Sequence, residues 1–217
     1  MGIKRVMVNN NDNMISNKDK IADVTFVLSV KNGFDRVSIK QIQEESGLTT
    51  GSIYYHFKDK DEILLYIVNR YLINSIHIII KKIRDLDGSL MEKIGLIFNY
   101  EKSPIIKEVE SLDILNKFPI DYSEYWLLYT SIFHQHPEIR HLFYELYDEL
   151  YEFLYDLIQE AVEKKEIRDD IDIEELVTFI KTTLKGYLVV IVCQPNFSAE
   201  KLLDANMKLI WEAVKKR

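Results

Sequence analysis

The sequence predicts an all-α protein: an N-terminal three-helix bundle followed by a larger helical domain. Glycine and proline number only 7 and 4 among 217 residues, which favours long helices over a sheet rich in turns. Apolar residues recur at 3.6-residue spacing along much of the chain, and Ser, Thr or Asp stands before several of these stretches as a capping residue. We expect a flexible arm over residues 1–17, the small bundle over 18–62 and the larger domain over 63–217.

The composition predicts a cytoplasmic protein without a membrane partner. Hydrophobic residues make up 47% and charged residues 29% of the chain, the balance of a soluble globular protein. A single cysteine, Cys193, excludes an internal disulfide framework and fits a reducing compartment. Residues 1–17 lack the apolar core of a signal peptide. We expect no membrane span, because the apolar stretches 72–80 and 186–193 are shorter than the roughly 20 residues required.

Charge is distributed unevenly along the chain. The net charge is −7, but residues 1–60 carry nine basic and seven acidic residues, a net charge of +2. The remaining 19 basic and 28 acidic residues give −9. A mildly basic unit on an acidic body indicates that only the N-terminal part approaches phosphate groups.

The N-terminal elements follow from turn and capping residues. We expect the first helix over 18–32, ended by Gly33. The second begins at Ser38, which forms a capping box with Gln41 three residues later. Gly47 suits the left-handed position that ends that helix.

A short polar helix comes next. Thr49 caps it, and Asp59 with Glu62 forms the capping pair of a long helix that continues to about Asp85. A helix of about two turns is marginal alone in water, so its neighbours must hold it. Three helices joined by such tight turns predict a helix-turn-helix unit.

The bundle resembles a known family. Its pattern contains Gly33-Phe34, Ser38-Ile39, Gly47-Leu48-Thr49, Gly51-Ser52-Ile53-Tyr54-Tyr55-His56-Phe57-Lys58-Asp59-Lys60 and Glu62-Ile63-Leu64. This pattern, over about residues 18–66, resembles the DNA-binding domain of the tetracycline-repressor (TetR) family. Ser29 stands where the family has a large apolar residue, and Gln43 and Ser46 replace its usual alanines. We expect these three departures to affect packing of the small domain more than its DNA-facing surface.

The resemblance implies that the short helix enters the major groove of DNA. Gly51 would allow a close approach of the backbone, and the hydroxyl groups would contact phosphates or base edges. We expect the ring of Tyr54 to pack partly inward, Tyr55 and His56 to point outward, and Lys60 to bind a phosphate. The expected DNA-binding residues are Ser38, Thr49, Thr50, Gly51, Ser52, Tyr54, Tyr55, His56 and Lys60.

The larger domain begins with weak periodicity over residues 85–121, where we expect short helices and loops. Helices are predicted over 123–135, from Pro137 to about Lys164, and over 173–192 and 198–215. The resemblance implies that the last two helices pack against their copies in a dimer; the alternative is that they close a monomeric core. The expected dimer face comprises Leu176, Ile180, Thr183, Leu184, Tyr187, Ile191, Leu203, Met207, Ile210 and Val214.

Aromatic residues form stripes on two of the predicted helices. Ordinary helix packing is one interpretation, and a ligand pocket walled by rings is the other. The resemblance implies an effector pocket in this domain. Few basic residues interrupt the stripes, which favours an apolar, aromatic or cationic guest. The candidate effector residues are Tyr122, Trp126, Tyr129, Phe133, Tyr147 and Tyr151.

Catalytic and metal-binding patterns are lacking, so we expect no enzyme and no cofactor. His134, His136 and His141 lie close together in sequence, but Pro137 divides them between two helices. We therefore expect exposed or capping histidines rather than converging metal ligands. Cys193 is expected to be a small buried hydrophobe.

These features together predict a homodimeric DNA-binding regulator, a repressor acting on an inverted-repeat operator. An effector bound in the larger domain would change the separation of the two DNA-binding units, with the helix from residue 60 to 85 as the coupling element. Two alternatives stay open: a helical ligand-binding protein or enzyme that retains the bundle, and a DNA-organising regulator without an effector. The operator, the regulated genes, the effector and the sign of regulation stay open as well.

Overall fold

A computed structural model describes residues 16–98, 122–194 and 196–216. These residues form helices and no strand, which confirms the all-α prediction. The chain divides into two compact units. Unit 1 holds residues 1–72 and 114–137, and unit 2 holds 73–113 and 138–217. Of the predicted arm, residues 1–15 lie outside the described residues, and Ser16 caps the first helix through a hydrogen bond from the Asp19 amide.

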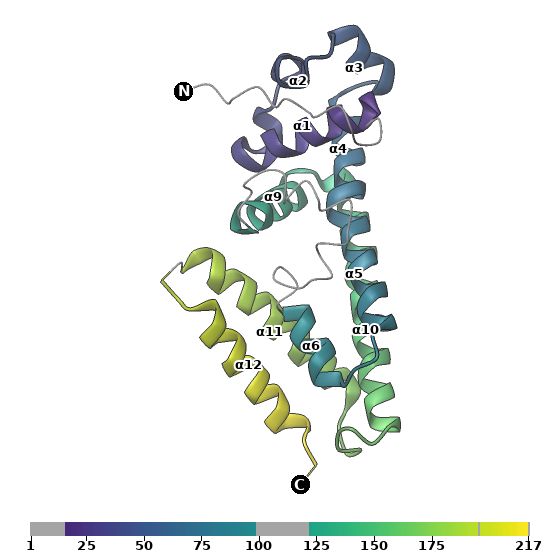
Figure 1. Ribbon diagram of the computed structural model, residues 1–217, viewed down its shortest axis with the longest axis vertical. Coiled ribbons are helices and arrows are strands. Elements are labelled where there is room, and N and C mark those ends of the chain that lie inside the picture. The colour runs from purple at the N-terminus through teal and green to yellow at the C-terminus, as the bar shows by residue number, and fades with distance from the viewer. Residues whose placement is uncertain (1–15, 99–121, 195, 217) are drawn as a thin grey trace. The chain divides into compact units, whose positions relative to one another are not determined.

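Unit 1 contains the predicted three-helix bundle (Figure 1). Its elements are α1 (Asn17–Asn32), the 3-10 turn η1 (Phe34–Arg36), α2 (Ile39–Ser46), α3 (Thr50–His56), α4 (Lys60–Ile67) and α9 (Tyr122–Gln135). Helix α1 contacts α2, α3, α4 and α9, and it is almost wholly buried from Thr25 to Val30. Ile42, Ile53 and Phe57 are buried as well. The core of unit 1 therefore surrounds α1.

The predicted caps are present. Ser38 and Gln41 form the full capping box of α2, and Gly47 ends that helix with a left-handed φ of 67°. The Thr49 hydroxyl accepts a hydrogen bond from the Ser52 amide at 3.1 Å. Asp59 caps α4, although the Glu62 carboxylate accepts from the Lys58 amide at 2.6 Å rather than from the Asp59 amide.

The division into units differs from the expected boundary at residues 62 and 63. Unit 1 extends to Leu72 and includes α9, because α9 packs on α1. The ring of Tyr125 meets Phe26 edge-on at 6.2 Å, and its hydroxyl donates to the Tyr71 carbonyl at 3.0 Å. The expected domain from residue 63 onward is thus divided between the two units.

The long helix Lys60–Asp85 contains a wider turn in its middle. It begins as α4, continues through the π-helical segment η2 (Val68–Ile73) and ends as α5 (Asn74–Asp85). The boundary between the units falls within η2, after Leu72. Short π segments inside α-helices are uncommon and occur frequently at functional sites.

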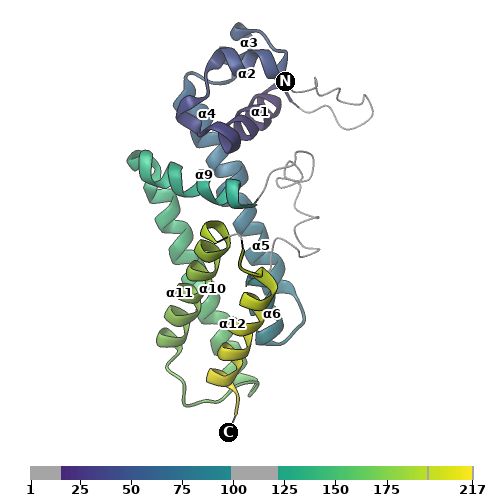
Figure 2. The ribbon, with the colours of Figure 1, turned by 90° about the vertical axis from the view of Figure 1, so that its left-hand side faces the viewer.

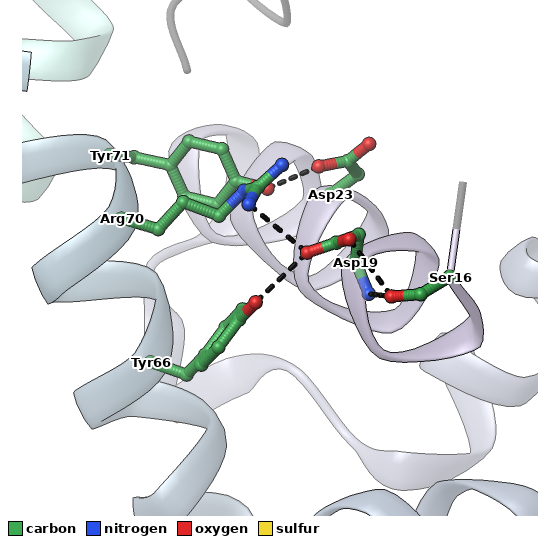
Figure 3. A network of polar contacts seen from close by, with 6 residues as sticks. All are labelled: Ser16, Asp19, Asp23, Tyr66, Arg70 and Tyr71. Atoms are coloured by element: carbon green, nitrogen blue, oxygen red, sulfur yellow. Dashed lines mark hydrogen bonds and ion pairs between the residues drawn. The ribbon is translucent and has the colours of Figure 1, made fainter. Parts of the chain in front are cut away.

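Side chains of α4 and η2 bind two carboxylates on α1 (Figure 3). Asp19 accepts from the Tyr66 hydroxyl at 2.8 Å and pairs with Arg70 at 3.0 Å, while the Tyr71 hydroxyl donates to Asp23. Burial raises the pKa of Tyr71, and the charge of Asp23 raises it further. The polar contacts therefore fix α1 to the C-terminal end of α4.

Unit 2 is a bundle of the remaining helices (Figure 2). They are α5, α6 (Leu90–Phe98), α10 (Arg140–Glu163), α11 (Ile173–Cys193) and α12 (Ala199–Val214), with the short turn η5 (Pro137–Ile139) before α10. Helix α10 contacts α5, α6 and α11, and α12 contacts α6 and α11. Of residues 85–121, where we expected short helices and loops, α6 lies in the described part, and residues 99–121 lie outside the described residues.

Two helices, Lys60–Asp85 and Ile173–Cys193, are long and apolar enough to cross a membrane by length and composition. This differs from the expectation that no such stretch exists. The most apolar window of the first helix is 56% buried, as in the core helix of a soluble protein. The most apolar window of the second helix is only 33% buried, so part of the apolar surface of α11 is not covered by the described residues.

Candidate nucleic-acid interface

Helix α3 exposes four of its six expected DNA-binding residues, and Ser52 and His56 are half-buried. Ile53 is buried on the inward side, whereas Thr50, Gly51 and Tyr54 are exposed. Tyr55 is the most exposed large side chain of the helix, at 82% of its surface. Caps at both ends and the buried Ile53 hold this short helix, so its outward face is free to contact another molecule.

The hydroxyl groups at the helix starts differ in what they can offer to DNA. The Thr49 oxygen accepts from Ser52, which leaves its own hydrogen available to a phosphate. The Ser38 hydroxyl accepts from the Gln41 amide and also donates to the Gln41 side chain at 2.9 Å. The Ser38 hydroxyl could therefore donate to a phosphate only if its hydrogen bond to the Gln41 side chain were broken.

One of the departures from the family pattern lies beside α3. The Thr50 hydroxyl donates to Oε1 of Gln43 on α2 at 2.6 Å. The expectation that Gln43 would affect packing rather than the DNA-facing surface is therefore corrected: it contacts an exposed residue of α3. Ser29 and Ser46 are buried, and their hydroxyls donate to backbone carbonyls, as expected of packing residues.

The rings of Tyr54 and His56 differ from expectation in opposite directions. Tyr54, expected to pack partly inward, is 53% exposed. The rings of Tyr55 and His56 meet edge-on at 5.1 Å, and His56 is half-buried. The exposed ring faces and hydroxyls provide apolar contact for a thymine methyl group and hydrogen bonds for phosphates.

Lys60 is held against its own unit. Its Nζ donates to the Asp35 carbonyl at 3.0 Å and lies 4.5 Å from the ring centre of Phe34. Burial lowers the pKa of Lys60, against the raising effect of Asp35 and Asp61. Since an ammonium group has three N–H bonds, two remain for the expected phosphate contact.

Exposed cations that were not predicted also lie on the bundle. Arg36 is exposed on η1, Lys40 on α2 and Lys58 directly after α3. Lys40 pairs with Glu44 only at 3.8 Å. The charge count of residues 1–60 indicated that such cations exist, but it could not show which of them are exposed.

The aromatic effector candidates fall in different units. Trp126 and Tyr129 of α9 stack with ring centres 5.2 Å apart, Tyr129 is buried and Phe133 is half-buried. The side chain of Tyr122 lies outside what the structure describes. Tyr147 and Tyr151 belong to α10 in unit 2.

Two lysines of α11 cover the tyrosines of α10. Lys181 lies 5.0 Å from the ring centre of Tyr151 and donates to the Tyr147 carbonyl at 3.3 Å, and Lys185 donates to the Tyr147 hydroxyl at 3.1 Å. The stripe of α10 that seemed free of basic residues in the sequence thus faces cations from the next helix. A cationic guest is disfavoured there.

The three clustered histidines point to separate partners. His136 pairs with Asp35 at 3.3 Å and meets the Phe34 ring edge-on. His141 lies 3.2 Å from the Glu138 carbonyl, and His134 is exposed. Among the described residues no group of three or more His, Cys, Asp or Glu side chains could hold a metal ion. Cys193, expected to be buried, is exposed.

The expected dimer face is largely used inside the chain. Its buried members are Leu176, Ile180, Leu184, Tyr187, Ile210 and Val214, and the others are half-buried. Met207 also lies against Gly95 of α6. A Cβ atom added to this glycine would be 3.6 Å from the Cε of Met207. Exposed small and apolar residues that recur at three- or four-residue spacing on α11 and α12 are instead Phe179, Thr182, Gly186, Val189, Cys193, Ala205 and Leu209. We call this set the outer face.

A helix-turn-helix protein is defined by two capped helices, α2 and α3, the tight turn at Gly47 between them, and the polar outer surface of α3. Comparison with known sequences shows which family of helix-turn-helix proteins this is. The chain belongs to the TetR family of transcriptional regulators: the family described as bacterial regulatory proteins, tetR family, matches residues 21–67, and the tetracyclin repressor-like C-terminal domain matches residues 132–194.

Curated relatives are helix-turn-helix transcriptional regulators of Staphylococcus aureus. One from strain MRSA252 is 31% identical over 141 residues, which cover 60% of this chain and 67% of the relative. One from strain bovine RF122 / ET3-1 is 30% identical over 107 residues, which cover 49% of this chain and 50% of the relative. The matches thus span about half to two thirds of these relatives.

Solved structures share the fold. A transcriptional regulator of Saccharomonospora viridis in complex with choline has a TM-score of 0.71 at 20% identity, covering 92% of this chain and 98% of that one. The regulator FadR of Bacillus subtilis in complex with stearoyl-CoA has a TM-score of 0.62 at 18% identity, covering 88% and 96%.

Proposed function

We propose that this protein is a cytoplasmic transcriptional repressor that binds an inverted-repeat operator as a homodimer and releases it on binding a small molecule. The outward face of α3 carries the DNA-binding part of this proposal. Its hydroxyls and rings suit phosphates and base edges, and exposed cations precede and follow it in the sequence. Fluorescence anisotropy with DNA from upstream of the protein's own gene, against scrambled DNA of the same length, tests specific binding.

The outer face of α11 and α12 supports the homodimer. Phe179 and Val189 are exposed large apolar side chains of α11, and Leu209 is one of α12. Gly186 lies between the two α11 residues on the same side of the helix, and nothing within 4 Å fills the space beside it. A second copy could therefore approach closely there. Its two-fold symmetry would match that of an inverted repeat.

The effector part of the proposal rests on the fold and on α9. Two proteins of the same fold are recorded with choline and with stearoyl-CoA, and the stacked rings of Trp126 and Tyr129 on α9 suit an apolar or aromatic guest. We propose that the helix Lys60–Asp85 transmits binding, because it continues from one unit into the other through η2. A thermal-shift screen with acyl thioesters, apolar aromatics and quaternary amines tests for a ligand.

A further inference from the structure

The hydrogen bond between Thr50 and Gln43 links the two helices of the helix-turn-helix. Thr50 stands in the first turn of α3 and is exposed, and Gln43 is half-buried on α2. The bond between Oγ1 and Oε1 is 2.6 Å long. The backbone carbonyl of Gln43 serves the turn separately, by accepting from the Gly47 amide at 2.9 Å.

This bond determines what each side chain can offer. A threonine hydroxyl has one hydrogen, and here Gln43 receives it. The Thr50 oxygen can then only accept, so it suits an amino group and not a phosphate oxygen, which has no hydrogen to donate. Because Oε1 of Gln43 faces Thr50, the Nε2 amide, with its two N–H bonds, supplies the donors that Gln43 can offer to DNA.

We propose that Gln43 and Thr50 together read one base pair of each half-site. In the major groove, amino groups belong to adenine (N6) and cytosine (N4), and each lies beside an acceptor: N7 of the same adenine, or O6 of the guanine paired with the cytosine. The Thr50 oxygen would accept from the amino group while Gln43 Nε2 donates to the neighbouring acceptor. The inference rests on the proposed binding of α3 in the major groove.

Selection from a random DNA pool tests this pair, with the parent chain and three variants. Gln43→Ala removes the amide and frees the Thr50 hydrogen. Thr50→Val removes the acceptor at nearly constant shape. Gln43→Glu can still accept from Thr50 but exchanges the outward N–H groups for an oxygen. Thermal melting and solution mass of each variant verify that fold and oligomeric state are retained.

We expect Gln43→Ala and Thr50→Val to lose preference at the same single position of each half-site, by about fivefold or more, since a good side chain–base pair discriminates by ~1–3 kcal/mol. Gln43→Glu should shift that position toward cytosine, whose N4 amino group carboxylates accept from. Unchanged base preferences in all three folded variants would overturn the inference, as would a loss of affinity equal for every sequence. If the parent itself enriched no sequence, the proposed DNA-binding function would fail as well.

Discussion

At the scale of single residues, the surface of α3 contains more aromatic and hydroxyl groups than charges. Tyr55 is exposed over 82% of its surface and contacts His56 within the chain. We expect Tyr55→Ala to weaken operator binding by about tenfold or more, since a lost base or phosphate contact costs ~1–3 kcal/mol. The melting temperature should stay within a degree or two, because exposed positions contribute little to folding. Equal affinities of parent and variant would remove Tyr55 from the interface.

Lys60 provides a test through salt dependence. If one of its free N–H groups binds a phosphate, Lys60→Ala should lower the slope of log K against log salt by about 0.9. Its ammonium group also lies over the ring of Phe34, so the variant should unfold slightly more easily, by about 0.5–1 kcal/mol. The matched control is Lys81→Ala, which removes an exposed lysine of α5 in unit 2. Equal slopes for the two variants would show that Lys60 serves packing only.

Asp19 gives the fold a dependence on acid. Burial raises the pKa of Asp19, but hydrogen bonds from Ser16 and Tyr66 and the charge of Arg70 outweigh it, and the net pKa lies below its ordinary value of 3.8. The ionised carboxylate therefore stabilises the fold above about pH 4, and this contribution is lost as the pH falls further.

We expect Asp19→Asn to lower the free energy of unfolding at pH 7 by about 1–3 kcal/mol. The variant should also lose less stability than the parent between pH 4 and pH 2. Urea titrations across this range measure both effects. Asp169→Asn, in an exposed loop, controls for the change of net charge. A pH profile of Asp19→Asn parallel to that of the parent would contradict the assignment.

At the scale of elements, η2 is held by a neighbouring helix. The hydroxyl of Tyr125 on α9 donates to the carbonyl of Tyr71 within this π segment, and both residues are buried. Tyr125→Phe would leave that carbonyl without this partner. We expect the variant to be destabilised by about 1–3 kcal/mol, whereas Tyr54→Phe, on an exposed tyrosine, should melt like the parent. Equal melting temperatures for both variants would show that this hydrogen bond is dispensable.

The sequence predicted elements best where local chemistry decides them. Ser38, Thr49 and Asp59 cap helices as expected because a cap depends on residues three positions apart. The π segment was not predictable, since the apolar spacing of residues 60–85 continues through it. The contact between Gln43 and Thr50 depends on the crossing of two helices, which no spacing within one helix reveals.

At the scale of the whole molecule, the choice of the dimer face shows the limit of periodicity. Helix α11 is apolar on more than one side, so both the buried set around Ile180 and the exposed set around Phe179 fit a helical stripe. Only the structure shows which of the two packs inside the chain. The contacts of lysines with Tyr147 and Tyr151 could likewise not be predicted from the sequence, because the lysines belong to α11 and the tyrosines to α10.

The outer face can be tested by charge. We expect Phe179→Asp combined with Leu209→Asp to convert the dimer to a monomer in analytical ultracentrifugation, because each carboxylate would be desolvated in the interface. The melting temperature should become independent of protein concentration. The charge-matched control is Thr178→Asp with Lys208→Gln, at exposed positions outside the outer face. An unchanged dimer would exclude this face from the dimer interface. If the parent chain were instead monomeric and floated with lipid vesicles, and the double variant did not float, the face would bind a membrane.

Selection from a random DNA pool with the parent protein tests the central claim most directly, because it requires α3 to read DNA and two copies to act together. We predict enrichment of an inverted repeat whose half-sites are centred about one helical turn, or a multiple of it, apart. Enrichment should disappear for the Phe179→Asp, Leu209→Asp monomer. Enrichment of no sequence, or of a single half-site with equal affinity for parent and monomer, would contradict the account.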